Sequence, residues 1–436
     1  MKTVFHGGIH PAGRKELSRY RQPDRVFQPT QVVIPLRQHI GSACEPLVKV
    51  GDTVALGQKI GDGEGMCVPI HASVSGRVVA IEEHPHPGGG NVKSVVIKND
   101  GRNTPAERAE KSRRPWETLS KEEILGRIRE GGVVGMGGAA FPTGVKADVE
   151  SGQIDTLIVN ACECEPYITA DDTLLSLYPT QVLNGAKILA KVLEPMYIVM
   201  AVEDNKTEAI AALRAALDES KFQQIHLEIL PARYPQGGEK QLIYAVTGRE
   251  VPSGKLPKDV GAGVFNAATC AAVSKAVDEE IPLVRRIVTV TGEGVNRPMN
   301  LIVPIGTPVS ELIEEAGGLK TSAVKVITGG PMMGRAQETL DIPVVKGTNA
   351  ISCLVEDDGV GDGICIHCGL CVGVCPMHLQ PLYLYQYSEV KDLNALKEFC
   401  LMDCIECGCC TYVCPGKIPL VRWIREGKSA VKEGGI

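Results

Sequence analysis

The first hundred residues alternate short apolar segments with turns, a pattern typical of β-strands rather than helices. Gly-Asp and Ser-Gly pairs separate these segments as hairpin turns do. Strands are expected within residues 32–36, 47–50, 51–60 and 70–81. Residues 99–121 are charged and polar and contain Pro105 and Pro115, so they are expected to form a linker over the surface.

Residues 30–98 resemble the biotinyl/lipoyl hammerhead fold. A carrier domain of that kind needs a Lys to modify at the tip between its two halves, but no Lys occurs between Lys59 and Lys93. The resemblance therefore implies a structural module. With the arm that precedes it, this module is the expected first domain, residues 1–98.

The periodicity changes after the linker. Ser120 and Glu123 form a capping-box pattern at the start of a helix that is expected to end at residues 131–132. Further strands are expected at 154–159, 196–202 and 225–230, with an alanine-rich helix at 205–220 capped by Asn205. Because alternating strands and helices produce a parallel sheet, residues 122–283 are expected to form a Rossmann-like domain.

Two further domains are expected beyond this sheet. Residues 284–350 suit a small β-grasp domain, with strands at 287–291, 300–304 and 324–328 and a helix at 308–316. Residues 351–436 are expected to form a ferredoxin-like helical domain. Its last amphipathic stretch, residues 420–425, is expected to pack on that domain or on a neighbouring subunit. The fold class is thus multidomain α/β and α+β.

Composition narrows the class of protein. With 436 residues, the chain is about three times the usual length of one domain, and 44% hydrophobic and 22% charged residues are typical of folded proteins. A net charge of −6 without a long Lys/Arg run gives no electrostatic footprint for nucleic acid. No stretch is apolar enough to span a bilayer and no apolar leader opens the chain, so a cytoplasmic location is expected.

The cysteines are clustered. Ten of the sixteen lie between Cys365 and Cys414, in two copies of the spacing C-x2-C-x2-C-x3-C-P. In two-cluster ferredoxins the fourth cysteine of each copy binds the other cluster. One [4Fe-4S] cluster is therefore expected on Cys365, Cys368, Cys371 and Cys414, and the second on Cys404, Cys407, Cys410 and Cys375.

Structural zinc or unpaired thiols are the alternatives for these cysteines. Zinc usually takes two C-x2-C pairs, whereas three cysteines at successive x2 spacings followed by Cys-Pro favour a cubane. Cys400 and Cys409 do not fit the spacing, and each is expected to be a buried thiol.

Two glycine-rich segments and one acidic loop could bind a nucleotide. Gly135, Gly137 and Gly138 would let backbone N–H groups approach a phosphate, with Lys146 adding a charge; a tight structural turn is the alternative. Residues 160–166 follow a strand directly, at the edge of a parallel sheet where ligands bind, unless they are a solvated acidic loop. Residues 234–241, with Gly237, open a helix in a similar way. The C-x-C pair within the acidic loop is expected to be a bystander rather than a metal site.

Redox chemistry connects these segments. A nicotinamide delivers a hydride, two electrons at once, while a [4Fe-4S] cluster accepts one. A flavin is the cofactor that takes part in both kinds of transfer. A nucleotide-binding domain beside two cubanes therefore implies a flavin as well as NAD(H).

The order of these motifs, together with residues 5–11, 329–334 and 343–349, resembles the C subunit of Rnf-type ion-translocating ferredoxin:NAD oxidoreductases over nearly the whole chain. The nucleotide-binding domain is also similar to the NADH-oxidising flavoprotein subunit of respiratory complex I. This resemblance implies FMN contacts at Gly137, Gly138, Lys146, Asn160, Glu163, Asn266 and Thr269, and NADH contacts at Phe141, Glu165 and Glu239. Met136, Cys162 and Gly238 differ from the complex I pattern, so no contact is carried over to them.

The resemblance implies a peripheral subunit on the cytoplasmic face of the cell membrane. It would pass electrons between NAD(H), FMN and two [4Fe-4S] clusters. Its partners would be integral membrane subunits and an iron–sulfur subunit that accepts electrons from ferredoxin, in a complex that transports Na+ or H+. The alternatives are a soluble flavin/iron–sulfur cobalamin reductase, which lacks the segment 30–98, and an electron-relay docking subunit without flavin.

Overall fold

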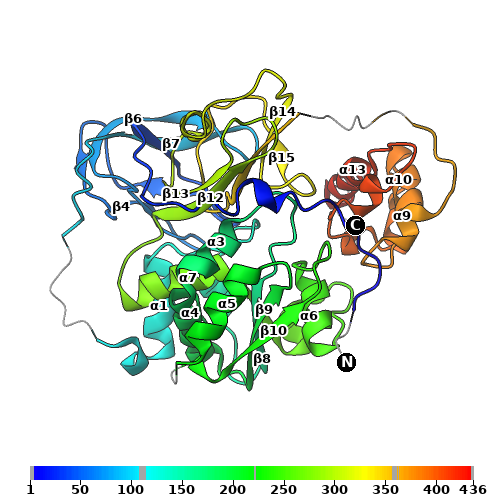
Figure 1. Ribbon diagram of the computed structural model, residues 1–436, viewed down its shortest axis with the longest axis horizontal. Helices are drawn as coiled ribbons and strands as arrows, with labels where there is room; N and C mark the ends of the chain where they lie inside the picture. Colours follow the sequence, from blue (N-terminus) through cyan, green and yellow to red (C-terminus); the bar gives the residue numbers. More distant parts are fainter. Residues whose placement is uncertain (1–3, 108–113, 220–221, 356–360, 362, 434–436) are drawn as a thin grey trace.

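A computed structural model describes residues 4–107, 114–219, 222–355, 361 and 363–433. Figure 1 shows two β-rich regions side by side, a layered α/β region against them, and a group of short helices at one end of the molecule. The described part of the chain contains no helix that is long and apolar enough to cross a membrane.

The N-terminal region forms two small antiparallel sheets around one core. Its strands are β1 (Gln31–Pro35), β2 (Glu45–Pro46), β3 (Thr53–Val54), β4 (Lys59–Asp62), β5 (Ile70–His71), β6 (Gly76–Pro85) and β7 (Asn91–Asn99). They pair in the orders β1-β7-β6-β3 and β2-β4-β5. The strand expected at 47–50 is wrong: Leu47 and Val50 are 58% and 59% exposed, so their apolar side chains contribute nothing to a buried face.

The α/β region is built on a parallel sheet in the order β10-β9-β8-β11, of which the sequence predicts all strands but β11. Its strands are β8 (Thr156–Ala161), β9 (Tyr197–Glu203), β10 (Ile225–Leu230) and β11 (Ala262–Asn266). Its helices are α1 (Lys121–Glu130), α2 (Thr143–Ala147), α3 (Ala170–Leu177), α4 (Pro179–Leu193), α5 (Thr207–Leu217), α6 (Glu239–Thr247) and α7 (Ala267–Asp278), with a 3-10 turn at Pro257–Val260.

Two helix caps were expected from the sequence in this region, and one of them is confirmed. The capping box of α1 is confirmed, with the Ser120 side chain accepting from the backbone of Glu123 and the Glu123 carboxylate accepting in return. The cap expected at Asn205 is wrong. Helix α5 begins two residues later, after Lys206, whose buried ammonium points toward Glu163 and Glu203. Residue 220, the expected end of this helix, lies outside the described residues.

The second β-rich region is a five-stranded sheet in the order β13-β12-β16-β14-β15. Its elements are β12 (Arg285–Thr291), β13 (Met299–Pro304), α8 (Val309–Glu315), β14 (Lys325–Thr328), β15 (Arg335–Ala336) and β16 (Ala350–Leu354). Strand β16 lies beyond the boundary expected at residue 350. It belongs to this sheet because it pairs with both β12 and β14, and its Ile351 and Cys353 are fully buried in the core.

The linker expected at 99–121 lies only partly on the surface. Pro105 forms a β-bridge with Leu56, and Trp116 and Leu119 are 6% and 3% exposed in the core of the α/β region. Large apolar side chains anchor the segment at its C-terminal end, next to the 3-10 turn Trp116–Thr118. Residues 108–113 lie outside the described part of the chain.

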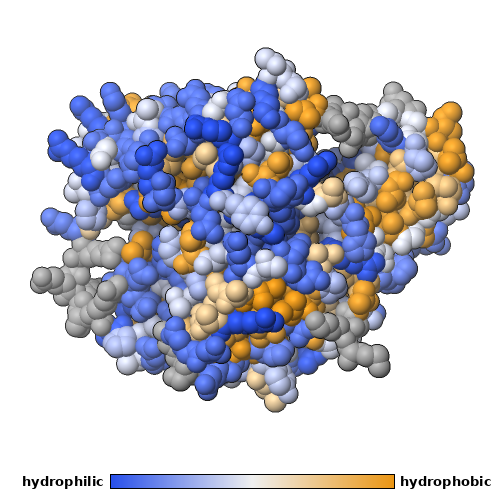
Figure 2. Space-filling view, in the orientation of Figure 1, coloured by the Kyte–Doolittle hydropathy of each residue, from blue (hydrophilic) through white to orange (hydrophobic). Residues whose placement is uncertain are grey.

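The C-terminal region consists of short helices. They are α9 (Leu370–Gly373), α10 (Pro381–Glu389), α11 (Leu393–Glu398), α12 (Cys409–Tyr412) and α13 (Leu420–Glu433), with a 3-10 turn at Leu401–Asp403. Helix α13 packs on α10 and α11, as expected for the amphipathic stretch that it contains. Figure 2 shows apolar residues on the surface of this end of the molecule, and among the exposed ones are Ile364, Ile366 and Leu370.

Helices α4 and α7 cross in close contact because α4 carries Gly185 there. A Cβ atom at Gly185 would lie 1.8 Å from the carbonyl oxygen of Cys270. We expect Gly185→Ala to destabilise the protein by about 1–3 kcal/mol, since backbone must move to admit the methyl group. Gly126→Ala in α1, where a Cβ would meet no atom within 4 Å, should instead stabilise by about 0.5–1 kcal/mol. Thermal unfolding of both variants measures these changes in stability. Equal melting temperatures for Gly185→Ala and Gly126→Ala would contradict the close contact between α4 and α7.

Candidate functional site

The two cysteine motifs form two separate pockets. One pocket is lined by Cys365, Cys368, Cys371 and Cys414, and the other by Cys375, Cys404, Cys407 and Cys410 together with the spare Cys409. Of the eight cysteines that fit the spacing, each pocket thus takes three from one copy of the motif and the fourth from the other copy. These are the two groupings that the spacing predicts.

The two copies also share their backbone shape. His367 and Glu406, at equivalent positions, have positive φ angles of 55° and 57°, and Gly369 and Gly408 follow with 76° and 83°. A short helix begins directly after each glycine and the two helices, α9 and α12, contact each other. Two equivalent loops therefore face each other, as a pair of crossed cubane sites requires.

Four thiol groups in a largely apolar pocket fit a [4Fe-4S] cluster, whose irons take one thiolate each. The first pocket is lined by Ile364, Ile366 and Leu370 besides its cysteines, and the second by Leu379, Leu384 and Ile424. The spare thiols differ from each other. Cys409 is fully buried, as expected, and lines the second pocket, whereas Cys400 is exposed, because it follows the end of α11 at the surface.

The two pockets differ in exposure. Cys368 of the first is exposed, whereas Cys375, Cys407 and Cys410 of the second are 7–8% exposed. The second pocket also adjoins the α/β region. The Tyr234 hydroxyl donates to the carbonyl oxygen of Cys407 at 2.7 Å, and the Gln241 amide donates to that of Pro376 at 3.2 Å. The glycine-rich turn 234–241 is therefore a docking surface for the cysteine loops, a role that the sequence did not reveal.

The N-terminal arm completes this junction. Gly8 donates a backbone hydrogen bond to Val374, next to Cys375, and Ile9 forms a bridge with Tyr234. The Arg233 guanidinium stacks on the Phe5 ring at 4.8 Å. The arm thus lies between the α/β region and the second cysteine pocket.

The nucleotide-binding candidates meet at the carboxyl edge of the parallel sheet. Asn160 and Asn266 are paired in register at the ends of β8 and β11. Asn160 donates to the carbonyl oxygen of Gly237 at 2.8 Å, and Asn266 caps α7 by accepting from the backbone of Thr269. The Thr269 hydroxyl in turn accepts from Met136 N at 2.9 Å, which ties the first glycine-rich loop to α7.

This edge suits a phosphate-bearing ligand. Gly138 has a φ of +119°, and a Cβ atom there would meet no atom within 4 Å, so this part of the loop backbone is open to close approach. At the base of the loop, Gly135 donates to the carbonyl oxygen of Phe141. Lys146 forms an ion pair with Glu239 at 2.6 Å, which brings an expected FMN residue next to an expected NADH residue.

Glu163 is not part of a solvated acidic loop. Its side chain is 4% exposed, and its carboxylate accepts from the backbone of Asp171 at 2.6 Å and Asp172 at 3.3 Å, at the start of α3. Burial raises its pKa to about 7. Lys206 lies 3.6 Å away, and the Lys15 ammonium donates to the carbonyl oxygen of Glu163 at 2.8 Å. No sequence pattern marks these two lysines, since each acts singly from a distant segment.

Glu165 holds the second β-rich region. Its carboxylate accepts from Met333 N at 2.7 Å and from Met332 N at 3.1 Å, in the loop that follows β14. A Cβ atom at Gly330 would lie 2.2 Å from this carboxylate, so only glycine allows the approach. A position at which the resemblance implies NADH contact is therefore occupied by an interdomain contact in this structure.

The residues that differ from the complex I pattern have structural partners. Cys162 is fully buried, with its thiol 3.7 Å from the Ala201 carbonyl oxygen, while the Cys164 sulfur accepts from Gly237 N at 3.3 Å. The two thiols of this C-x-C pair therefore face different surroundings. Met136 is 5% exposed, and Gly238 precedes the first residue of α6.

Comparison with known families defines the class of protein. The chain matches family models described as the RnfC barrel sandwich hybrid domain (residues 3–102), the Nuo51 FMN-binding domain (128–275), the SLBB domain (287–336) and the 4Fe-4S dicluster domain (359–415). It is thus a multidomain iron–sulfur flavoprotein, with an FMN-binding domain and a dicluster domain in one chain.

Two similar proteins show the family to which this chain belongs. The chain is 45% identical to the C subunit of the proton-translocating ferredoxin:NAD(+) oxidoreductase complex of Clostridium ljungdahlii, over 100% of this chain and 95% of the relative. It is 44% identical to the C subunit of the Na(+)-translocating complex of Acetobacterium woodii, over 98% and 97%. The protein belongs to the RnfC family, the C subunits of ion-translocating ferredoxin:NAD oxidoreductases, and the resemblance seen in the sequence is confirmed.

Other relatives are longer or share only the fold. The C subunit of an ion-translocating oxidoreductase complex from Cronobacter sakazakii is 43% identical over 98% of this chain, which spans 55% of that protein. A chain of an NAD+-reducing [NiFe]-hydrogenase is 18% identical, with a TM-score of 0.51 over 73% of this chain and 63% of its own. This chain and the hydrogenase chain therefore share a fold.

The crossed groupings lead to a prediction about iron content. Cys368→Ala removes one ligand from the first pocket only, so we expect loss of roughly half of the bound iron. Cys400→Ala, a change at an exposed cysteine of the same region, should retain all of it. Iron quantified per chain in anaerobically purified protein gives the answer, and unchanged iron in Cys368→Ala would rule out its role as a ligand.

Glu165 should make stability depend on pH. Burial, which outweighs the N–H groups of Met332 and Met333, raises its pKa from 4.5 to about 7. A raised pKa in the folded state means that this carboxyl stabilises the fold fully below the unfolded value and loses that contribution as the pH rises through about 7. Glu165→Gln should flatten the fall in melting temperature between about pH 4.5 and 7. The exposed Glu64→Gln is the control, and parallel profiles for wild type and Glu165→Gln would contradict the shift.

Proposed function

We propose that the protein is the NAD(H)-linked flavin and iron–sulfur subunit of an Rnf-type membrane complex, which passes electrons between NAD(H), FMN and two [4Fe-4S] clusters. The names of the relatives from C. ljungdahlii and A. woodii, each similar over almost the whole chain, support this function. The FMN-binding and dicluster domains in the same chain support the cofactor set.

The observation that carries the proposal is the position of the two cysteine pockets. The buried pocket adjoins the turn 234–241 of the α/β region through Tyr234 and Gln241, and the other pocket opens to solvent at Cys368. We infer that the buried site exchanges electrons with the flavin, and that the exposed site exchanges them with a partner protein. Exposed Ile364, Ile366 and Leu370 around that site offer an apolar contact surface.

In this proposal the protein supplies position rather than acid–base chemistry. When bound, FMN couples the two-electron chemistry of a nicotinamide to single-electron transfer. Gly135, Gly137, Gly138 and Lys146 would hold its phosphate, and Asn160, Glu163, Asn266 and Thr269 would shape the site at the ends of β8 and β11. Phe141, Gly237 and Glu239 would line the approach of NADH. Glu165 would act beside them through the loop 329–334 that it holds.

The domains would divide these tasks. We assign residues 1–98 to the barrel-sandwich domain, 99–121 to the linker, 122–283 to FMN and NAD(H) binding, 284 onward to the β-grasp or SLBB domain, and the C-terminal residues to the clusters. Strand β16 moves the last boundary from 350 to beyond residue 354. The match of residues 3–102 to the RnfC barrel-sandwich model argues against a cobalamin reductase, which lacks this segment.

The proposed setting is the cytoplasmic face of the cell membrane, where the protein would contact integral membrane subunits and an iron–sulfur subunit that accepts electrons from ferredoxin. One relative is named for proton transport and the other for Na+ transport, and this chain is 45% and 44% identical to them. The proposed function therefore covers electron transfer by this subunit and assigns neither ion.

An anaerobic titration of the purified chain with NADH tests this function. We expect bleaching of flavin absorbance together with EPR signals of reduced clusters, because electrons that enter at the flavin would reach the buried pocket. Protein that contains iron but no flavin, and that does not react with NADH, would instead be an electron relay.

Lys146 separates flavin binding from cluster binding. Lys146→Ala removes the charge beside the open glycine-rich loop, so we expect FMN retention to fall about tenfold or more while iron content stays unchanged. Lys240→Ala, which neutralises a partly exposed lysine near the same edge, is the matched control. Flavin released by denaturation, measured per iron by fluorescence, reports the result. Loss of iron with full flavin occupancy would contradict the assignment of Lys146 to FMN binding.

A further inference from the structure

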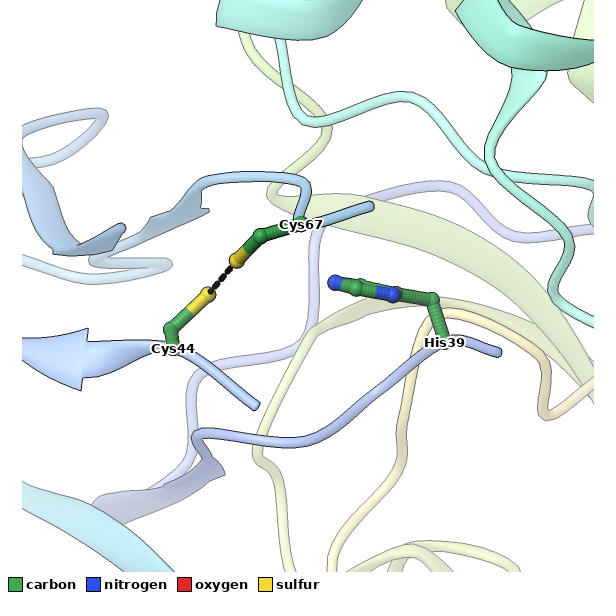
Figure 3. A group of neighbouring side chains, drawn as sticks. All are labelled: His39, Cys44 and Cys67. Atoms are coloured by element: carbon green, nitrogen blue, oxygen red, sulfur yellow. Dashed lines mark hydrogen bonds between the residues drawn. The ribbon is translucent and has the colours of Figure 1, made fainter. Parts of the chain in front are cut away.

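A buried group of sulfur and nitrogen atoms lies in the N-terminal β domain, away from the two cysteine pockets. His39, Cys44 and Cys67 each offer one ligand atom, and these atoms all lie within 4.8 Å of one another. The three residues are 7%, 3% and 3% exposed. Figure 3 shows the two thiols pointing toward each other, with the edge of the imidazole ring beside them.

Contacts around the group orient the ligand atoms. The two sulfur atoms are 3.3 Å apart. The His39 Nδ1 atom lies 3.1 Å from the carbonyl oxygen of Ile40, whereas Nε2 accepts from the backbone N–H of Val68 at 3.0 Å. In the tautomer protonated at Nδ1, this nitrogen donates to the Ile40 carbonyl oxygen and Nε2 keeps a lone pair that can bind a metal ion. The same hydrogen bond fixes the orientation of the imidazole ring. Histidine ligands of metal ions are held in this way.

The geometry and donor types match a zinc-type ion. Two sulfurs and one imidazole nitrogen are soft or borderline ligands, which zinc prefers, and three protein ligands leave a fourth position for water. Atoms bound at about 2.3 Å around a tetrahedral ion lie roughly 3.8 Å apart. The separations in this group, from 3.3 Å to at most 4.8 Å, are within reach of that arrangement after small side-chain rotations.

The charge of the surroundings is also compatible. Lys346 is 1% exposed, and its ammonium donates to the carbonyl oxygens of Pro69 and Gly132, at 2.9 and 2.8 Å. Burial lowers the pKa of this lysine to about 8, and the nearby Cys44 and Cys67 are the groups that act in the opposite direction. Two thiolates cancel the charge of one divalent cation, so occupation of the site adds no net charge near this buried lysine.

We propose that His39 Nε2 and the sulfur atoms of Cys44 and Cys67 bind one soft divalent cation of the Zn2+ type. Binding forms two metal–sulfur bonds and one metal–nitrogen bond, releases the two thiol protons to solvent, and replaces the contact from Val68 N–H to Nε2. The proposed electron transfer does not use these three residues.

The site would act as a clamp behind the glycine-rich loop. It joins the segment after β1 to the turn before β5, and the first of these segments contacts the α/β region: Ile40 N donates to the carbonyl oxygen of Ala140 at 3.3 Å. Gln38 accepts from Lys346 N at 3.0 Å in the same segment. A bound ion would therefore stabilise the contact between the N-terminal β domain and the loop that contains Gly138.

The test uses the full chain, purified anaerobically with its clusters. Each sample receives a small excess of ZnCl2, passes through gel filtration, and is analysed for zinc and iron together. We expect about one zinc per chain in the wild type, and at least a fivefold loss in Cys44→Ala and in Cys67→Ala with iron unchanged. Cys353→Ala, a buried cysteine of β16 outside both pockets, should keep its zinc and is the matched control.

Iron content shows whether each variant has folded, and zinc-edge X-ray absorption of the wild type gives an answer that needs no variant. Two sulfur ligands at about 2.3 Å with one or two nitrogen or oxygen ligands support the site. Three results would overturn it: iron-replete wild type without zinc, zinc retained in both cysteine variants, or a disulfide between Cys44 and Cys67 in the anaerobic protein. None of them bears on reduction of the flavin by NADH.

Discussion

Buried charges must be paired, and this requirement organises the centre of the molecule. Glu163 and Glu165 follow β8 into the interior, where an unpaired carboxylate would be costly. Glu163 is satisfied by the start of α3 and by the nearby Lys206, and Glu165 by the backbone of Met332 and Met333. Lys15 donates to the carbonyl oxygens of both glutamates and brings in the N-terminal arm. One acidic loop therefore joins the arm, the parallel sheet and the second β-rich region.

The same junction extends to the cysteine pockets. Met332, whose backbone N–H donates to Glu165, also lies against Gly408 in the second cysteine loop, where a Cβ atom would be 3.1 Å from the Met332 carbonyl oxygen. Tyr234 approaches that loop from the α/β side. The buried pocket is thus held by two domains at once, which fixes its separation from the carboxyl edge of the parallel sheet, where we propose that the flavin binds. The other pocket stays at the surface, where a partner protein can reach it.

The N-terminal β domain contacts two other regions of the molecule. It contacts the second β-rich region through Ser73, which donates to the carbonyl oxygen of Ile305, and the glycine-rich loop through Ile40. A metal clamp at His39, Cys44 and Cys67 would stiffen the segment that makes the second contact. Such a role would be structural.

Features with a short-range or periodic signal were determined by the sequence itself. Three of the four parallel strands, β8, β9 and β10, were visible as apolar runs, the start of α1 as a capping box, and the crossed cysteine groupings as a repeated spacing, because each depends on residues close together in the chain. The family resemblance rested on the same local motifs. Tertiary structure alone decided the partners of Glu163 and Glu165, the exposure of Cys400, and the place of β16 in the second sheet. It also decided the meeting of His39 with Cys44 and Cys67. These contacts join single residues from distant segments, and a single residue leaves no period or spacing from which its partner can be read.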